Sequence, residues 1–160
     1  MEQLTEKGVL NIYQMVGRFI LMYGRIEMHL TYVTTIVWEG AGGQTLRGRA
    51  KFPRHMATRH QFLTESFDAL GVLQPYRAEW RSIQADMKRP EQIRHGVVHG
   101  VWDGKLGDLT FRRIAHDGSP NAEIMSTTEH ELSDMDDVVL GLVGRTEKFA
   151  RRLEKAFVPQ

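Results

Sequence analysis

Apolar residues recur every three or four positions over most of the chain, which is the spacing of one face of an α-helix. This spacing predicts a long first helix over about residues 9–38, ended by the glycines that follow Glu39. The pattern returns over about 54–70 and 75–100, where Pro75 suits a first turn and Pro90 should kink or restart the helix. A last helix is predicted over about 133–157, because Ser133 followed by Asp136 resembles a helix start.

The period changes from Trp102 onward. Turn-forming residues, Asp103-Gly104 and then Asp117 to Asn121, flank a short run from Leu109 to Ile114 that suits a strand. We therefore predict a small antiparallel β-hairpin at about 102–127. The expected fold is mainly α, a helical bundle of four to five helices with this hairpin inserted before the last helix.

Composition sets the frame for this fold. The 160 residues are 41% hydrophobic and 26% charged, which fits one compact domain over residues 1–160. We expect no membrane segment, since no long apolar run occurs, and the start of the chain lacks a signal-peptide layout, so a cytoplasmic location is the default expectation. The absence of cysteine excludes disulfides, thiol catalysis and thiolate metal sites.

Arg94, His95 and His99 form the segment best suited to chemistry. Imidazoles exchange protons near neutral pH and a guanidinium suits a phosphate, so the set fits phosphodiester chemistry. On a helix, His95 and His99 lie about 40° apart and Arg94 lies about 100° from His95. Gly100 is a plausible helix stop, which places His99 in the last turn. The alternative is a structural histidine pair and a capping arginine.

The two histidines could also supply half of a metal site, because side chains four residues apart on a helix aim at one point. No Glu follows His95 as in His-Glu-x-x-His, and the chain offers no cysteine ligand. We therefore expect neither a metal nor another cofactor.

Charge is unevenly distributed, although the net charge is only +1. A basic run without acids contrasts with an acidic segment from Glu129 to Asp137. One interpretation is that this run binds the phosphates of RNA, which releases their counterions. The alternative is that it is an ordinary solvated loop and the start of a helix. Its cationic residues are Arg47, Arg49, Lys51, Arg54 and Arg59.

Two residues of the first helix are candidates for a supporting role. Glu27 lies on a helix rich in apolar positions, and an inward carboxylate needs a cationic partner, for which Arg94 is the natural candidate. An exposed Glu27 near Arg25 is the alternative. Tyr23 either supplies a hydroxyl to the site or packs as a core aromatic.

The sequence Arg94-His95-x3-His99 resembles the Arg-(Asn, Asp or His)-x3-His pattern of the HEPN superfamily, the higher eukaryotes and prokaryotes nucleotide-binding domains. The segment from Phe19 to Leu30, with Tyr23 and Glu27, is similar to the first helix of bacterial members, and Val97 to Trp102 resembles the ending of their motif. The chain departs from the commoner pattern in having His95 where Asn is more frequent. The resemblance implies helical bundles that are commonly dimeric, many of them metal-independent endoribonucleases.

This resemblance implies RNA cleavage through the ribose 2′-hydroxyl. His99 would be the general base or acid, Arg94 would stabilise the transition state, and His95 would position the substrate or transfer a second proton. A two-fold homodimer would bring two Arg94/His99 pairs face to face. The alternatives are a non-catalytic module that binds RNA, a nucleotide or a protein, and an interaction domain of a toxin–antitoxin or phage-defence pair with an antitoxin protein as partner.

Overall fold

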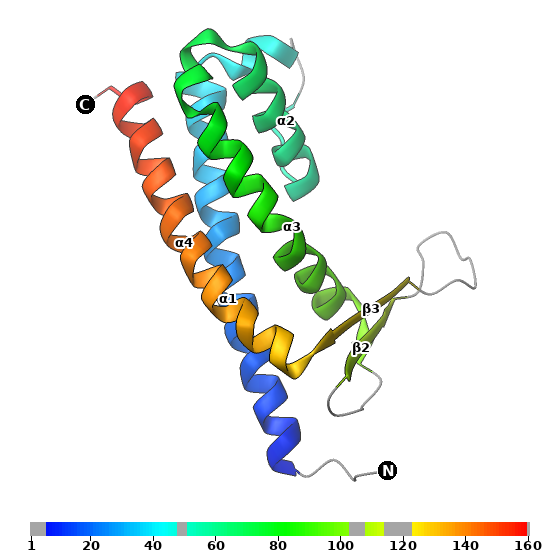
Figure 1. The fold of residues 1–160 in the computed structure, drawn as a ribbon. Coiled ribbons are helices and arrows are strands. Elements are labelled where there is room, and N and C mark those ends of the chain that lie inside the picture. Colours follow the sequence, from blue (N-terminus) through cyan, green and yellow to red (C-terminus); the bar gives the residue numbers. More distant parts are fainter. Residues whose placement is uncertain (1–5, 48–50, 103–107, 114–122, 160) are drawn as a thin grey trace. The chain divides into compact units, whose positions relative to one another are not determined.

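The computed structural model describes residues 6–47, 51–102, 108–113 and 123–159. Within these residues the chain forms four α-helices and three short strands, so the predicted mainly α fold with a hairpin directly before the last helix is confirmed (Figure 1). The elements in chain order are α1 (Glu6–Thr35), the π-helical turn η1 (Ile36–Gly40), the 3-10 turn η2 (Gly43–Arg47), α2 (Met56–Ala69), the 3-10 turn η3 (Gly71–Tyr76), α3 (Arg77–His99), β1 (Val101–Trp102), β2 (Asp108–Arg113), β3 (Glu123–Thr128) and α4 (Glu129–Phe157).

The chain divides into two compact units, to which α1, α3 and α4 each contribute. Unit 1 consists of Met1–Tyr23 and Lys88–Gly141, and unit 2 consists of Gly24–Met87 and Leu142–Gln160. The predicted single domain over residues 1–160 stays a prediction.

Unit 2 is a four-helix arrangement around an aromatic core. Phe67 of α2 stacks on Trp80 of α3 with ring centroids 5.8 Å apart, and it lies 5.7 Å from Phe149 of α4. All three side chains are buried. Polar contacts join the same helices: the indole nitrogen of Trp80 donates to Thr64 at 3.2 Å, and His29 of α1 meets the Thr146 hydroxyl of α4 at 3.0 Å.

Unit 1 contains the sheet, whose strand order is β1-β2-β3 with antiparallel pairing throughout. Trp102 faces Phe111, and Phe111 in turn faces Met125. Leu109 and Phe111 are two residues apart on β2, so their side chains point to the same face of the sheet, and both are buried. The predicted hairpin corresponds to β2 and β3, and the two-residue strand β1 extends it.

The start of α4 differs from the prediction. The helix begins at Glu129 rather than at Ser133. The Thr128 hydroxyl accepts a hydrogen bond from the backbone N–H of Glu131 at 2.9 Å, which is the cap expected of a Thr-x-x-Glu sequence. The prediction chose the wrong one of two cap-like sequences, because Ser133 also stands three residues before an acid.

The prolines also sit differently from expectation. Pro75 lies in η3, before α3 begins at Arg77, instead of in the first turn of the helix. Pro90 lies inside α3, which continues to His99, so the helix does not restart there; the other predicted outcome, a kink at Pro90, stays a prediction. Pro90 is buried, and the division between the two units, at Met87 and Lys88, comes within one turn before it. Among the helices that the structure describes, none is both long and apolar enough to cross a membrane.

Candidate functional site

Arg94, His95 and His99 lie on the last two turns of α3, in unit 1. The helix ends at His99, as predicted, and its final hydrogen bond runs from the Gly100 N–H to the Gly96 carbonyl at 2.7 Å. Ile93 is fully buried and anchors this end of α3 in the core.

The two imidazoles lie together on the surface. The ring centroids of His95 and His99 are 4.9 Å apart and the rings are tilted by 57°, which matches the separation expected from their four-residue spacing. Both side chains are exposed, so a ligand can reach them. Arg94 is half-buried and takes part in at least one interaction within the protein.

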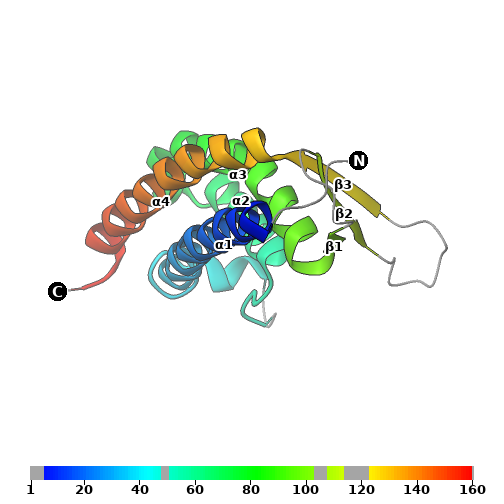
Figure 2. The same ribbon diagram turned by 90° about the horizontal axis from the view of Figure 1, so that it is seen from below.

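Gly100 fixes how the chain leaves this helix. A Cβ at this position would lie 2.8 Å from the Phe111 Cβ of β2, and it would lie still closer to the Gly96 carbonyl oxygen. Real Cβ atoms do not tolerate such contacts, so only glycine allows α3 to approach β2 this closely. The close approach lets β1 begin at Val101 and pair with β2, and Figure 2 shows the strands next to the end of α3.

A polar cluster connects α3 to the base of α4 in unit 1. The Arg89 Nε donates to the Glu131 Oε1 at 2.7 Å, and the Arg89 Nη2 reaches the Ser126 carbonyl at 3.3 Å. The Thr127 hydroxyl donates to the other Glu131 oxygen at 2.8 Å. Arg89 stands five residues before Arg94, so this cluster ties the helix that carries the candidate site to β3 and α4.

The Glu131 carboxyl keeps its charge readily in this cluster. Its partial burial raises its pKa, but the hydrogen bonds from Arg89 and Thr127 outweigh that effect and hold the pKa below the usual glutamate range. Neither Arg89 nor Glu131 was among the site residues predicted from the sequence. The Thr128-x-x-Glu131 sequence, a capping box, was the signal that could have indicated the second of them.

The two predicted supporting residues lie in different units. Tyr23 belongs to unit 1, where it is buried and stacks on Phe19 with ring centroids 6.2 Å apart, as the core-aromatic alternative expected. Glu27 belongs to unit 2, where it is half-buried, and it takes part in at least one interaction within the protein. Its predicted pairing with Arg94, and a role for the Tyr23 hydroxyl, stay predictions.

The basic run belongs to unit 2, whereas the arginine–histidine set belongs to unit 1. Lys51 and Arg54 are exposed and lie just before α2, which begins at Met56. The dipole of a helix favours anions at its N-terminal end, as the positive charges of these two residues do. Arg59 is half-buried and its Nε donates to the Pro53 carbonyl at 3.2 Å. The Arg47 side chain and all of Arg49 lie outside the described residues.

A metal centre finds no support in the described part of the chain. No group of three or more histidine, aspartate or glutamate side chains there could hold an ion. His95 and His99 would supply two ligands, and a third would have to come from outside these residues.

No family model matches the chain, and neither a curated protein nor a solved structure is significantly similar to it. A fold by itself does not specify a function, which depends on the residues of the site.

Proposed function

We propose that the protein is a metal-independent endoribonuclease whose catalytic residues are Arg94, His95 and His99. The observation that carries the proposal is the exposed pair of imidazoles 4.9 Å apart, next to a half-buried arginine in the same two turns of α3. The HEPN-like motif Arg94-His95-x3-His99 supports the same assignment.

The reaction needs one proton acceptor and one proton donor. A neutral imidazole removes the proton of the ribose 2′-hydroxyl, whose oxygen attacks the neighbouring phosphorus, and a protonated imidazole gives a proton to the departing 5′-oxygen. The products are a 2′,3′-cyclic phosphate and a 5′-hydroxyl end. His95 and His99 divide these two roles between them, one acting as the base and the other as the acid. Arg94 stabilises the negative charge that develops on the phosphoryl oxygens.

The basic run supports RNA as the substrate class. Exposed Lys51 and Arg54 suit phosphates without reading bases, so they would add affinity that depends strongly on salt. A role as a toxin or phage-defence component, with an antitoxin protein as partner, belongs to this proposal through the HEPN resemblance alone.

Cleavage of a mixed-sequence RNA in EDTA is the deciding experiment. Wild type should cut, and His99→Ala should reduce the rate by roughly 100-fold or more, because general acid–base catalysis commonly contributes that much. His130→Ala is the matched control, since His130 is an exposed histidine on α4 in the same unit and its partner is Asp134 at 3.6 Å. Its rate should equal that of wild type.

The product ends provide a second test. Attack by the 2′-hydroxyl predicts cyclic phosphate ends, and an RNA with 2′-O-methyl groups should resist cleavage. Folded wild type that binds RNA without cutting it would refute the nuclease and leave the non-catalytic binding module. In that case Arg94→Ala should weaken RNA binding, while His99→Ala should leave it nearly unchanged.

A further inference from the structure

Arg89 stands directly before Pro90, at a weak point of α3. Proline has no N–H, so the helix lacks the hydrogen bond that position 90 would otherwise donate to the carbonyl of position 86. Arg94, His95 and His99 all lie on the helical segment after this point, within unit 1. Where these three side chains lie therefore depends on what holds this segment to the rest of unit 1.

Contacts within unit 1 hold this segment at both of its ends. At its start, the Nε and the Nη2 of Arg89 meet the same oxygen of Glu131, at 2.7 and 2.5 Å. The Nη2 also donates to the Ser126 carbonyl at 3.3 Å. At its end, Gly100 packs so closely against Phe111 that a Cβ at position 100 would not fit. The segment is thus held to α4 and β3 at its start and to β2 at its end.

Glu131 is itself fixed by its neighbours along the chain. The Thr127 hydroxyl donates to the carboxylate oxygen that faces away from Arg89, at 2.8 Å. The Glu131 backbone N–H donates to the Thr128 hydroxyl at 2.9 Å, and the Thr127 side chain is buried. Because both of its oxygens are bonded, the carboxylate offers Arg89 an acceptor of fixed orientation, and a charge-assisted bond of this kind is among the stronger ones in a protein.

We propose that Arg89 and Glu131 are positioning residues of the proposed nuclease, which hold the end of α3 so that its arginine and two histidines reach one phosphate together. This role rests on the proposed function, and neither side chain touches the reacting atoms. A displacement of catalytic groups by about 1 Å can lower the rate roughly 100-fold, so the loss of either residue should act on kcat. Substrate binding should change little, because Lys51 and Arg54, proposed to bind phosphates, belong to unit 2.

Steady-state cleavage of a short RNA in EDTA tests this role with Arg89→Met, which keeps a long unbranched side chain and removes the guanidinium. Its kcat should fall roughly 10-fold to 100-fold, while KM should change by less than about two-fold. Arg89→Lys keeps the charge opposite Glu131 without the planar fork, and it should recover part of the loss. Glu131→Gln should also lower kcat, because an amide accepts at only one of its two terminal atoms.

Arg145→Met is the matched control. Arg145 likewise joins α4 to α3, since it pairs with Asp86 and donates to the Ser82 hydroxyl at 2.9 Å, and all three residues belong to unit 2. Its side chain is 41% exposed, against 40% for Arg89. The two substitutions should therefore lower the free energy of unfolding to a similar extent, but Arg145→Met should leave kcat within about two-fold of wild type.

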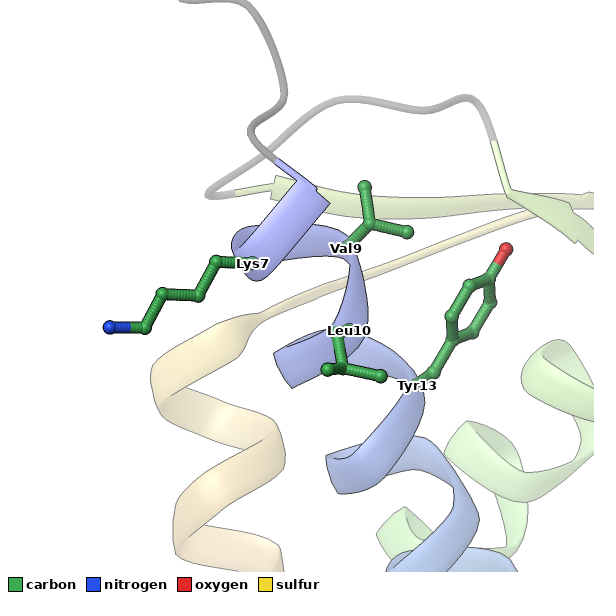
Figure 3. A pocket seen from close by; sticks show the side chains of 4 residues that line it. All are labelled: Lys7, Val9, Leu10 and Tyr13. Carbon is green, nitrogen blue, oxygen red and sulfur yellow. The ribbon is translucent and has the colours of Figure 1, made fainter.

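A second control lies in unit 1 itself. Leu10 is 58% exposed and lines a hollow of about 540 Å³ near the start of α1, together with Lys7, Val9 and Tyr13 (Figure 3). Leu10→Ala changes this hollow and removes none of the bonds that join Arg89 to Glu131 and Ser126. Its kcat should equal that of wild type, which would show that a surface change in the same unit does not reach the candidate site.

Hydrogen exchange measures the restraint on α3 without RNA. The backbone amides of residues 93–99 should exchange roughly 10-fold faster in Arg89→Met than in wild type, because local opening no longer has to break the bonds to Glu131. In Arg145→Met and Leu10→Ala these amides should exchange at the wild-type rate.

Cleavage by Arg89→Met at the wild-type rate, an equal loss of kcat in Arg145→Met, or unchanged exchange at the end of α3 would each overturn the positioning role. Faster exchange in Arg89→Met, together with no cleavage by folded wild type, would refute the nuclease, while the restraint on α3 would stand. The exchange measurement thus separates a failure of the positioning role from a failure of the proposed function.

Discussion

Replacement of Gly100 by alanine adds one methyl group at the junction between the candidate site and the sheet. The new Cβ would lie 2.8 Å from the Phe111 Cβ and still closer to the Gly96 carbonyl oxygen. Relaxed contacts of this kind need about 3.5 Å or more, so α3 and β2 must move apart by several tenths of an ångström. Overpacking of this size costs about 1–3 kcal/mol.

A smaller effect opposes this cost. Alanine has fewer unfolded conformations than glycine, which stabilises the folded state by about 0.4–1 kcal/mol where the native backbone is compatible. We therefore expect Gly100→Ala to lower the free energy of unfolding by about 1–2 kcal/mol. Because β1 follows directly, the same change should displace His99 and slow any RNA cleavage.

Urea denaturation followed by circular dichroism measures the free energy of unfolding. Gly141→Ala is the control with the opposite sign: Gly141 is exposed on α4 in the same unit, and a Cβ there meets no atom within 4 Å. It should stabilise the protein by up to about 1 kcal/mol through helix propensity. A Gly100→Ala protein as stable as wild type, beside a stabilised Gly141→Ala, would show that α3 and β2 are not in close contact.

Three other predictions concern the polar contacts. The pKa of Glu131 is held below its usual 4.5, so the folded state binds a proton at this carboxyl less readily than the unfolded state does. The free energy of unfolding should therefore fall as pH drops below about 4.5. Arg89→Met should weaken this pH dependence in acid titrations followed by circular dichroism. Burial lowers the pKa of His29 below its usual 6.5, so the folded state again binds the proton less readily, and the free energy of unfolding should decline as pH falls below 6.5. This decline between about pH 7 and 5 should be shallower in His29→Gln. The same decline in His29→Gln as in wild type would contradict the prediction. Thr64→Val removes the hydroxyl that accepts hydrogen bonds from the Trp80 indole N–H and from the Gln84 side chain, and it should cost about 1–2 kcal/mol in urea denaturation. A neutral result would show that these two bonds contribute little.

Local patterns were enough to predict the helices and the hairpin. Apolar residues three and four apart gave α1, α2 and the body of α3, because a helix repeats every 3.6 residues wherever it lies in the fold. At the start of α4, where two local signals competed, the prediction failed, because Thr128 rather than Ser133 caps the helix. At Pro90 a kink or a restart was predicted, and α3 does not restart there. In a packed helix, tertiary contacts offset the local cost of a proline, and that balance is invisible in the sequence.

The sequence by itself determined which residues make up the candidate site. The four-residue spacing of His95 and His99 brings their rings together on any helix, and Gly100 ends that helix wherever it packs. Only the tertiary structure decided what surrounds them. The close approach of Gly100 to Phe111 and the bonds from Arg89 to Glu131 join residues 11 and 42 positions apart, and no periodicity encodes contacts at such separations. The same holds for Tyr23, which the fold buries, because the apolar pattern of α1 alone does not say which side of that helix the core covers.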